Sequence, residues 1–156
     1  MTRPPIPDPP YEGGCLCGLT RYRVNAKPVT MTACHCDACK KLSGGTNLLV
    51  ISVPRESFQH LQGEVQRYRR TAESGRQSDV VRCATCGTRL WHEPLAFAAI
   101  NIAAGTLDNP SWVVPATHIW VERALPAAIM QDDAVKFEGQ MPRDQQIAAL
   151  QKLYGT

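Results

Sequence analysis

Hydrophobic and polar residues alternate in short segments along most of this 156-residue chain. At 19–24, Thr20, Tyr22 and Val24 alternate with arginines, which is the pattern of a strand with one buried face. The most apolar run, TNLLVISV at 46–53, predicts a buried strand. By the same reasoning we expect further strands at 29–34, 64–69, 78–83, 89–92, 96–103 and 118–122.

Helical periodicity is strong only near the C-terminus. The segment 144–154 repeats apolar residues at helical spacing, and Gly155 is a natural end for it. A short helical turn is expected at 38–42, capped by Asp37 and ended by Gly44. The apolar face of the C-terminal helix would consist of Ile147, Leu150 and Leu153 with Tyr154.

Many short strands between turns rich in glycine and proline predict a mainly β, antiparallel fold with short helices and a C-terminal helix. Twelve prolines and eleven glycines agree with this prediction. Positions 1–11 are interpreted as a proline-rich, mobile lead-in of extended character. Positions 12–156 then form a single domain of ordinary size.

The composition, 44% hydrophobic and 20% charged, is typical of a soluble globular protein. No stretch reaches the roughly 20 apolar residues that a membrane span needs. Because the first residues also lack the apolar centre of an export signal, we expect a cytoplasmic protein that does not bind membranes.

The formal charge of +3 does not indicate nucleic-acid binding, because it counts every cysteine as neutral. If seven thiolates hold two zinc ions, seven charges are lost and four are gained, and the net charge becomes zero. Arg67, Arg69 and Arg70 lie in an alternating segment and are interpreted as one solvated strand face. The expected partner is therefore a small molecule.

The seven cysteines form three groups, CLC at 15–17, CHCDAC at 34–39 and CATC at 83–86. A disulfide framework would need an oxidising compartment, and an odd count would leave one thiol over. Buried structural cysteines would not keep spacings of two and three so consistently. Side chains at these spacings on a tight turn can reach one ion with zinc–sulfur bonds of about 2.3 Å. The spacing therefore predicts zinc binding.

The cysteines divide most economically into a group of three and a group of four. Cys34, Cys36 and Cys39 are close enough in sequence to form one site, and three protein ligands leave a coordination position open. The two remaining pairs lie far apart in sequence and would close a tetrahedral structural site. Because thiolates are soft ligands, the open site favours capture of a thiol over hydrolysis.

The three cysteine blocks, in this order, resemble those of the glutathione-dependent formaldehyde-activating enzyme family, which includes centromere protein V. Two later segments resemble the closing segments of that family, so the resemblance covers about 11–142. The segments are GGCLCG (13–18), CHCDACKKLSGG (34–45), CATCGT (83–88), PATHIWVERALP (115–126) and DDAVKFEG (132–139).

The resemblance implies a β-tent fold of antiparallel sheets and two zinc ions per chain. It also implies the activity of the family, a carbon–sulfur lyase or synthase reaction that joins glutathione to formaldehyde as S-hydroxymethylglutathione. The implied ligands of the structural zinc are Cys15, Cys17, Cys83 and Cys86, and those of the catalytic zinc are Cys34, Cys36 and Cys39.

The chain departs from the family pattern at two places, both expected to reshape the pocket wall. Arg82 stands where the family often has an aromatic residue, and LPAAI at 125–129 stands where proline–tryptophan is common. One alternative is a non-catalytic zinc-binding β-tent module that binds a protein or nucleic acid. Another is a related enzyme that acts on a different glutathione conjugate or aldehyde.

Several other residues are candidates for the site. Lys40 and Lys41 follow the triplet and would meet the carboxylates of glutathione, or else form a solvated turn. His35 lies between two ligands on an extended segment, so its side chain should point away from theirs and serve packing. Other candidates are His92 and His118, as ligands, proton carriers or core residues, and Trp91, Trp112 and Trp120, as core residues.

Overall fold

The computed structural model describes residues 2–155. The helices are α1 (Asp37–Ser43) and α2 (Arg143–Tyr154), with 3-10 turns at Arg55–Ser57, Ala104–Thr106 and Val121–Arg123. The strands are β1 (Tyr11–Gly14), β2 (Arg21–Val24), β3 (Thr30–Cys34), β4 (Leu48–Pro54), β5 (Phe58–Gln62), β6 (Val65–Thr71), β7 (Gln77–Cys83), β8 (Arg89–Pro94), β9 (Ala99–Ala103), β10 (Thr117–Ile119) and β11 (Val135–Phe137).

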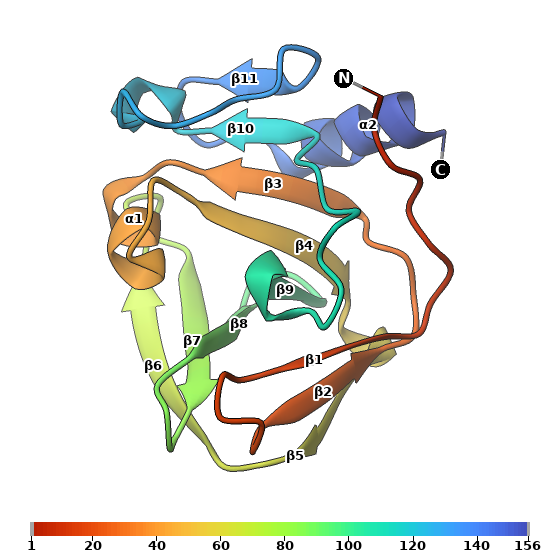
Figure 1. The fold of residues 1–156 in the computed structure, drawn as a ribbon. Coiled ribbons are helices and arrows are strands. Elements are labelled where there is room, and N and C mark those ends of the chain that lie inside the picture. The colour runs from red at the N-terminus through yellow and green to blue at the C-terminus, as the bar shows by residue number, and fades with distance from the viewer. Residues whose placement is uncertain (1, 156) are drawn as a thin grey trace.

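The strands form two sheets (Figure 1). The small sheet has the order β1-β2-β5, and the large sheet has the order β11-β10-β3-β4-β9-β8-β7-β6. Most neighbours are antiparallel, as predicted, but β10 runs parallel to both β3 and β11. The exception follows from the long connection after β9, which returns the chain to the β3 edge in the parallel direction. There β10, β11 and α2 lie together in Figure 1.

Successive residues of the central strands face two different layers, because side chains alternate along a strand. Met31 in β3 and Ile51 in β4 belong to the main core, to which the small sheet contributes Tyr22. Val50, next to Ile51, and Cys34, three residues after Met31, belong instead to a second apolar cluster on the opposite face of the large sheet. The fold thus separates a stabilising face from a face available for a site.

Trp91 and Trp112 are core residues, as predicted. Trp91 is fully buried, with its ring centroid 6.0 Å from that of Tyr22 and 4.8 Å from that of Phe58. Trp112 packs on Tyr11 with ring centroids 5.0 Å apart. Aromatic rings bury large apolar areas, so the two contacts of Trp91 join the small sheet to the large one.

The predicted strands are all present, with ends displaced by up to three residues. The strand predicted at 118–122 stops at Ile119, because Trp120 adopts a left-handed conformation (φ 58°) and a 3-10 turn follows. The expectation that Asp37 caps α1 is wrong: the cap is Cys36, whose sulfur accepts a hydrogen bond from the Cys39 backbone N–H. Gly44 ends the helix with φ 67°, as predicted.

The proline-rich lead-in has no regular element before β1, yet it packs against the domain. Ile6 is buried in the main core. The Arg3 guanidinium donates two hydrogen bonds of 2.8 Å to the Asp133 carboxylate. Ile6 and Arg3 therefore both contact the folded domain, and the extended, mobile character of the lead-in stays a prediction.

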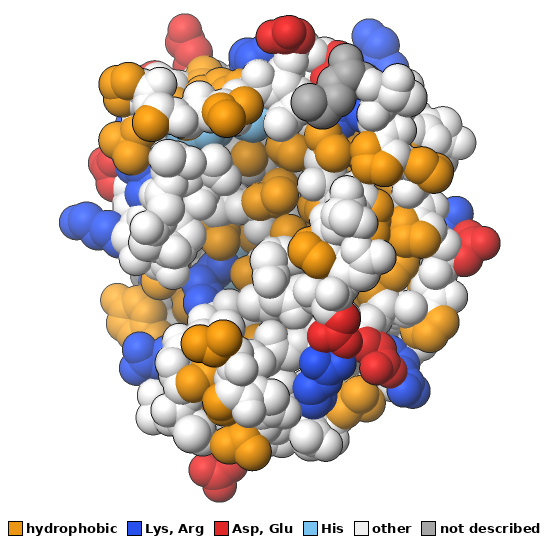
Figure 2. Space-filling view, viewed as in Figure 1, with side chains coloured by type: hydrophobic (Ala, Val, Ile, Leu, Met, Phe, Trp, Pro, Cys, Tyr) orange, Lys and Arg blue, Asp and Glu red, His pale blue; other side chains and the backbone are white. Residues whose placement is uncertain are grey.

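The surface over β1 and β2 carries acidic and basic side chains side by side (Figure 2). Arg23 donates to Glu12 at 2.6 Å, and Arg21 contacts Asp108.

Neither helix within residues 2–155 has the length and apolar character needed to cross a membrane.

Candidate functional site

Four cysteines from two distant turns converge at one end of the small sheet. Cys15 and Cys17 follow β1, Cys83 is the last residue of β7, and Cys86 lies in the turn after it. Gly18, with φ 79°, allows the first turn to reverse tightly. The four sulfurs lie within 4.8 Å of one another and could hold a metal ion.

The sulfur separations in this group exclude a disulfide. Cys15 Sγ lies 3.4 Å from Cys17 Sγ, which lies 3.9 Å from Cys83 Sγ. A disulfide bond is about 2.05 Å long. Backbone and hydroxyl donors surround the sulfurs: the Thr20 N–H lies 3.2 Å from Cys15 Sγ. Such hydrogen bonds favour the thiolate form, which is the form that binds metals.

The other three cysteines form a second group around the start of α1. Cys34 is the last residue of β3, Cys36 caps the helix, and Cys39 lies in its first turn. Their sulfurs also lie within 4.8 Å of one another. Hydrogen bonds with Cys34 and Cys39 lower the pKa of the Cys36 thiol, whereas hydrogen bonds with Cys36 and Cys39, together with burial, raise the pKa of the Cys34 thiol. The triplet thus already favours a negative charge on sulfur.

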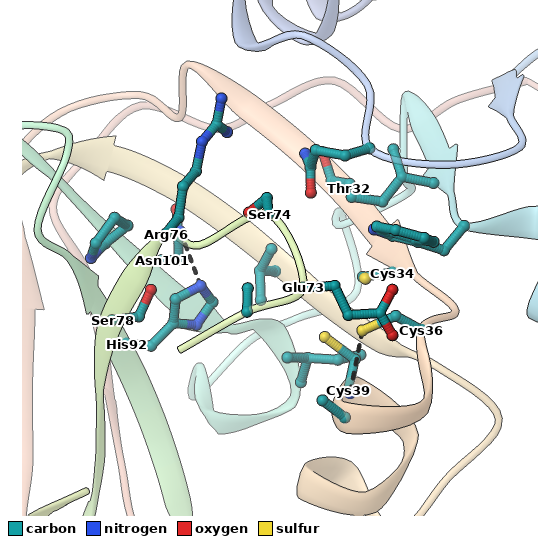
Figure 3. A pocket seen from close by; sticks show the side chains of 18 of the residues that line it. Thr32, Cys34, Cys36, Cys39, Glu73, Ser74, Arg76, Ser78, His92 and Asn101 are labelled. Atoms are coloured by element: carbon teal, nitrogen blue, oxygen red, sulfur yellow. Dashed lines mark hydrogen bonds between the residues drawn. The ribbon is translucent and has the colours of Figure 1, made fainter. Parts of the chain in front are cut away.

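The triplet opens into a cavity of about 210 Å³, and the four-cysteine group does not line that cavity. In Figure 3 the sulfurs of Cys34, Cys36 and Cys39 gather at one side, and His92 lies across the cavity from them. The floor consists of alternate residues from the face of the large sheet opposite the main core. These residues are Thr30, Thr32 and Cys34 of β3, Leu48 and Val50 of β4, His92 of β8 and Asn101 of β9.

Arg89 places a buried positive charge behind the triplet. Burial lowers the pKa of its guanidinium to about 10, and the neighbouring thiols of Cys39 and Cys34 act in the opposite direction. Its Nε and Nη1 atoms are buried with no hydrogen-bond partner among the described residues. A cation in this position offsets the negative charge that the thiolates concentrate.

Arg89 also fixes the tautomer of His92. Its Nη2 lies 2.8 Å from His92 Nδ1, and arginine can only donate, so Nδ1 accepts. A neutral ring then carries its proton on Nε2, which lies 2.9 Å from Asn101 Nδ2. Two donors cannot bond to each other, so the Asn101 amide must be turned by 180°. We therefore assign the amide oxygen of Asn101 as the acceptor of that proton. His92 is a neutral wall residue, and the histidine is not among the grouped metal donors.

Acid should destabilise the fold through His92. Burial, with Arg89 and Arg70 nearby, lowers its pKa from 6.5 to about 3. Between pH 6.5 and pH 3, His92 is protonated in the unfolded chain but stays neutral in the folded chain. The free energy of unfolding therefore falls as pH falls through this range, by about 1.4 kcal/mol per pH unit. Urea unfolding of wild type and His92→Gln from pH 5 to 7.5 should show a shallower pH dependence in the variant. Parallel curves would contradict the assignment.

The far end and the rim of the cavity carry positive charge. Arg70, Arg76, Arg123 and Arg143 all line it. Arg123 forms a two-pronged ion pair with Glu73, at 2.6 and 3.0 Å, which fastens the turn between β6 and β7 beside the triplet. Among residues 2–155, no carboxylate lies within 4.0 Å of the other three guanidinium groups. The cavity is therefore suited to an anionic ligand.

Comparison with known proteins identifies the family of the chain. Residues 10–123 match the family described as glutathione-dependent formaldehyde-activating enzyme. The chain belongs to this family. A crystal structure of a Rhodobacter sphaeroides protein shares the fold, with a TM-score of 0.51 and 14% identity over 81% of this chain and 98% of that one. No protein of curated function matches the sequence.

Membership of this family supports a coarse role for the chain, glutathione-dependent activation of formaldehyde. The two lysines predicted to contact glutathione lie outside the cavity lining. Lys40 Nζ donates to the Arg123 carbonyl oxygen at 2.7 Å and pairs with Asp37 at 3.0 Å. Lys41 is exposed on α1. Contact of either lysine with substrate stays a prediction.

His35, which belongs to the second cysteine block, forms a buried pair with His118. His35 Nε2 lies 3.0 Å from His118 Nδ1, and His118 Nε2 lies 2.9 Å from Gln131 Oε1. Since Nε2 of His118 donates to that oxygen, its Nδ1 accepts from His35. Both side chains are therefore used in packing, as expected for His35.

Four features differ from the sequence predictions. Trp120 is half-buried, lines the cavity and stacks under Arg123 at 4.7 Å, so its prediction as a core residue is wrong. Arg82 is exposed and does not line the cavity, and neither do residues 125–129, so these departures from the family pattern do not reshape its wall. Arg70 lines the cavity, so its interpretation as part of one solvated strand face with Arg67 and Arg69 is wrong. The other three arginines of the cavity and Asn101 were missed, because they come from segments that only the fold brings together.

Proposed function

We propose that this protein is a zinc enzyme that adds the thiol of glutathione to formaldehyde, giving S-hydroxymethylglutathione, and that it also catalyses the reverse cleavage. One observation carries the proposal. The three-cysteine group opens into a cavity lined by Arg70, Arg76 and Arg143, which have no ion-pair partner within residues 2–155, whereas the four-cysteine group does not line that cavity. A metal site that is open to a cavity and has arginines nearby suits a thiol compound that carries negative charge.

The donor set fits zinc at both groups. Zinc–sulfur bonds of about 2.3 Å at tetrahedral angles place neighbouring sulfurs roughly 3.8 Å apart. The separations of 3.4 and 3.9 Å between the sulfurs of Cys15, Cys17 and Cys83 are close to that value. We propose that this group holds a structural zinc, and that Cys34, Cys36 and Cys39 hold a second. A zinc ion there would lower the pKa of an incoming thiol and keep it as a thiolate.

The residues of the cavity would orient the reactants and exclude water. Leu48, Val50 and Ile119 give an apolar wall next to the triplet, and Arg70 lies close enough to favour the thiolate of Cys36. In the reaction, the sulfur lone pair forms the carbon–sulfur bond and the carbonyl π electrons move to oxygen. That oxygen then takes up the proton that the thiol has lost. Holding thiol and aldehyde together supplies the effective concentration that the reaction needs.

Metal stoichiometry and a thiol titration test the proposal together. We expect two zinc ions per chain, and we expect glutathione to change the visible spectrum of protein carrying cobalt(II) in place of zinc. The protein should also accelerate the exchange of ¹³C-formaldehyde with its glutathione adduct, measured by NMR. Two saturated metal sites with no spectral response to glutathione would instead indicate a non-catalytic module.

A further inference from the structure

Two arginines and one aromatic ring form a cluster at the end of the cavity away from the thiols. The guanidinium carbons of Arg76 and Arg143 lie 5.3 and 5.1 Å from the centroid of the Phe97 ring. Arg76 is exposed at the rim, and Arg143 is half-buried at the start of α2. Figure 3 shows Arg76 on the opposite side of the cavity from the three cysteines. We call these three residues the arginine clamp.

Strand register sets the distance between the clamp and the triplet. Arg143 donates to Ser52 Oγ at 3.3 Å, and Ser52 in β4 pairs with Thr30 in β3. Cys34 lies at the other end of β3, four residues on. Because a strand rises about 3.3 Å per residue, the two ends lie roughly 13 Å apart. Thr30 and Cys34 both line the cavity, so it runs the length of this strand.

The arginine clamp holds two positive charges close together, with no carboxylate of the described residues paired to either. Among the described residues, Arg76 and Arg143 have no ion-pair partner, and the only hydrogen bonds of Arg143 go to Ser52. The acid groups of the lining are engaged elsewhere, since Glu73 pairs with Arg123 and Asp37 with Lys40. Like charges held on one ring favour the arrival of an anion, and a guanidinium matches a carboxylate with two hydrogen bonds.

The turn that carries Arg76 is held in place. Within it, the Ala72 N–H donates to the Arg76 carbonyl oxygen at 2.8 Å, and the Gly75 N–H donates to Ala72 at 2.9 Å. The Glu73–Arg123 ion pair then ties the turn to the segment after β10. Arg76 is thus positioned before any ligand arrives, which reduces the entropy lost on binding.

We propose that the arginine clamp binds a terminal carboxylate of the thiol substrate and so selects long thiols over short ones. The inference rests on the proposed function, because it assumes that the thiol of the central residue of glutathione lies at the triplet. Glutathione carries a carboxylate at each end of a tripeptide, whereas the carboxylate of free cysteine lies next to its thiol and cannot span the cavity. The clamp would therefore determine specificity.

Calorimetric titration of the zinc-loaded protein tests the clamp. The ligands are glutathione, S-methylglutathione, which has the carboxylates but no free thiol, and cysteine. We expect Arg143→Gln and Arg76→Gln each to weaken both glutathione ligands about 10- to 100-fold and to leave cysteine binding unchanged. Arg143→Lys should restore part of the loss. Arg82→Gln, an exposed arginine outside the cavity, is the matched control.

The outcomes separate the clamp from the reaction. Equal weakening of glutathione and cysteine, or no weakening in either clamp variant, would overturn the clamp. If S-methylglutathione binds in a clamp-dependent way while glutathione leaves the cobalt spectrum unchanged, the clamp stands and the proposed function fails. Circular dichroism and thermal melting of each variant identify any loss of binding that comes from unfolding.

Discussion

Replacing Cys36 with serine is expected to abolish turnover and leave the protein folded. Serine is a favoured helix cap, so the bond to the Cys39 N–H that begins α1 can be kept. Serine is also a poor zinc ligand. Loss of a residue that only hydrogen-bonds to a metal ligand already lowers metal affinity or activity 10- to 100-fold, so loss of a ligand itself should cost more. We therefore expect the rate of adduct exchange to fall by more than about 100-fold, one zinc ion per chain to be lost, and the melting temperature to fall by only a few degrees.

A second substitution at this position serves as the control. Cys36→Ala removes the cap as well as the ligand, so it should be less stable than Cys36→Ser by about 1 kcal/mol while being equally inactive. Urea unfolding of the two variants measures that difference. Retention of two zinc ions and normal turnover in Cys36→Ser would show that the triplet is not the reactive site.

Replacing Cys83 with serine is expected to prevent stable folding. Cys83 is 1% exposed, and its sulfur lies 3.9 Å from that of Cys17, 66 residues away. Structural zinc contributes of order 10 kcal/mol of folding free energy, and a domain is stable by only about 5–15 kcal/mol in total. We expect aggregation or loss of the cooperative unfolding transition, measured by near-UV circular dichroism and urea titration.

The contrast between the two variants tests the division of the cysteines. A chelator strong enough to strip both ions should reproduce the Cys83→Ser result in wild-type protein. If Cys36→Ser and Cys83→Ser behave alike, either both folded or both unfolded, the division into four and three is wrong.

The sequence predicted the strands where burial leaves a pattern. The run at 46–53 is buried on nearly every residue of β4, and it was found with an error of two residues at its start. By contrast, β5 (FQHLQ) is mostly exposed on both faces and shows no alternation, so it was missed. The three-residue β11 was missed as well, because such a strand is too short to show a period.

The cysteine groups were predictable because metal geometry dictates local spacing, and the structure brings together the same seven residues in the same two sets. The arginine clamp was not predictable in the same way. Arg76 lies in a turn, Phe97 precedes β9 and Arg143 begins α2, and none has a spacing that marks a site. Trp120 was misjudged because its left-handed backbone follows from the tertiary fold, not from its neighbours in sequence.

The two cysteine groups also differ in when they can form. The triplet lies within six residues of chain, so closing it costs little conformational entropy and it is complete once residue 39 has been synthesised. The four-cysteine group must wait for residue 86 and for β7 to reach its place beside the first turn. During synthesis or refolding, metal binding at the triplet therefore indicates only that residues 34–39 have taken up their local structure. Metal binding by all four of the other cysteines indicates that the two sheets have come together.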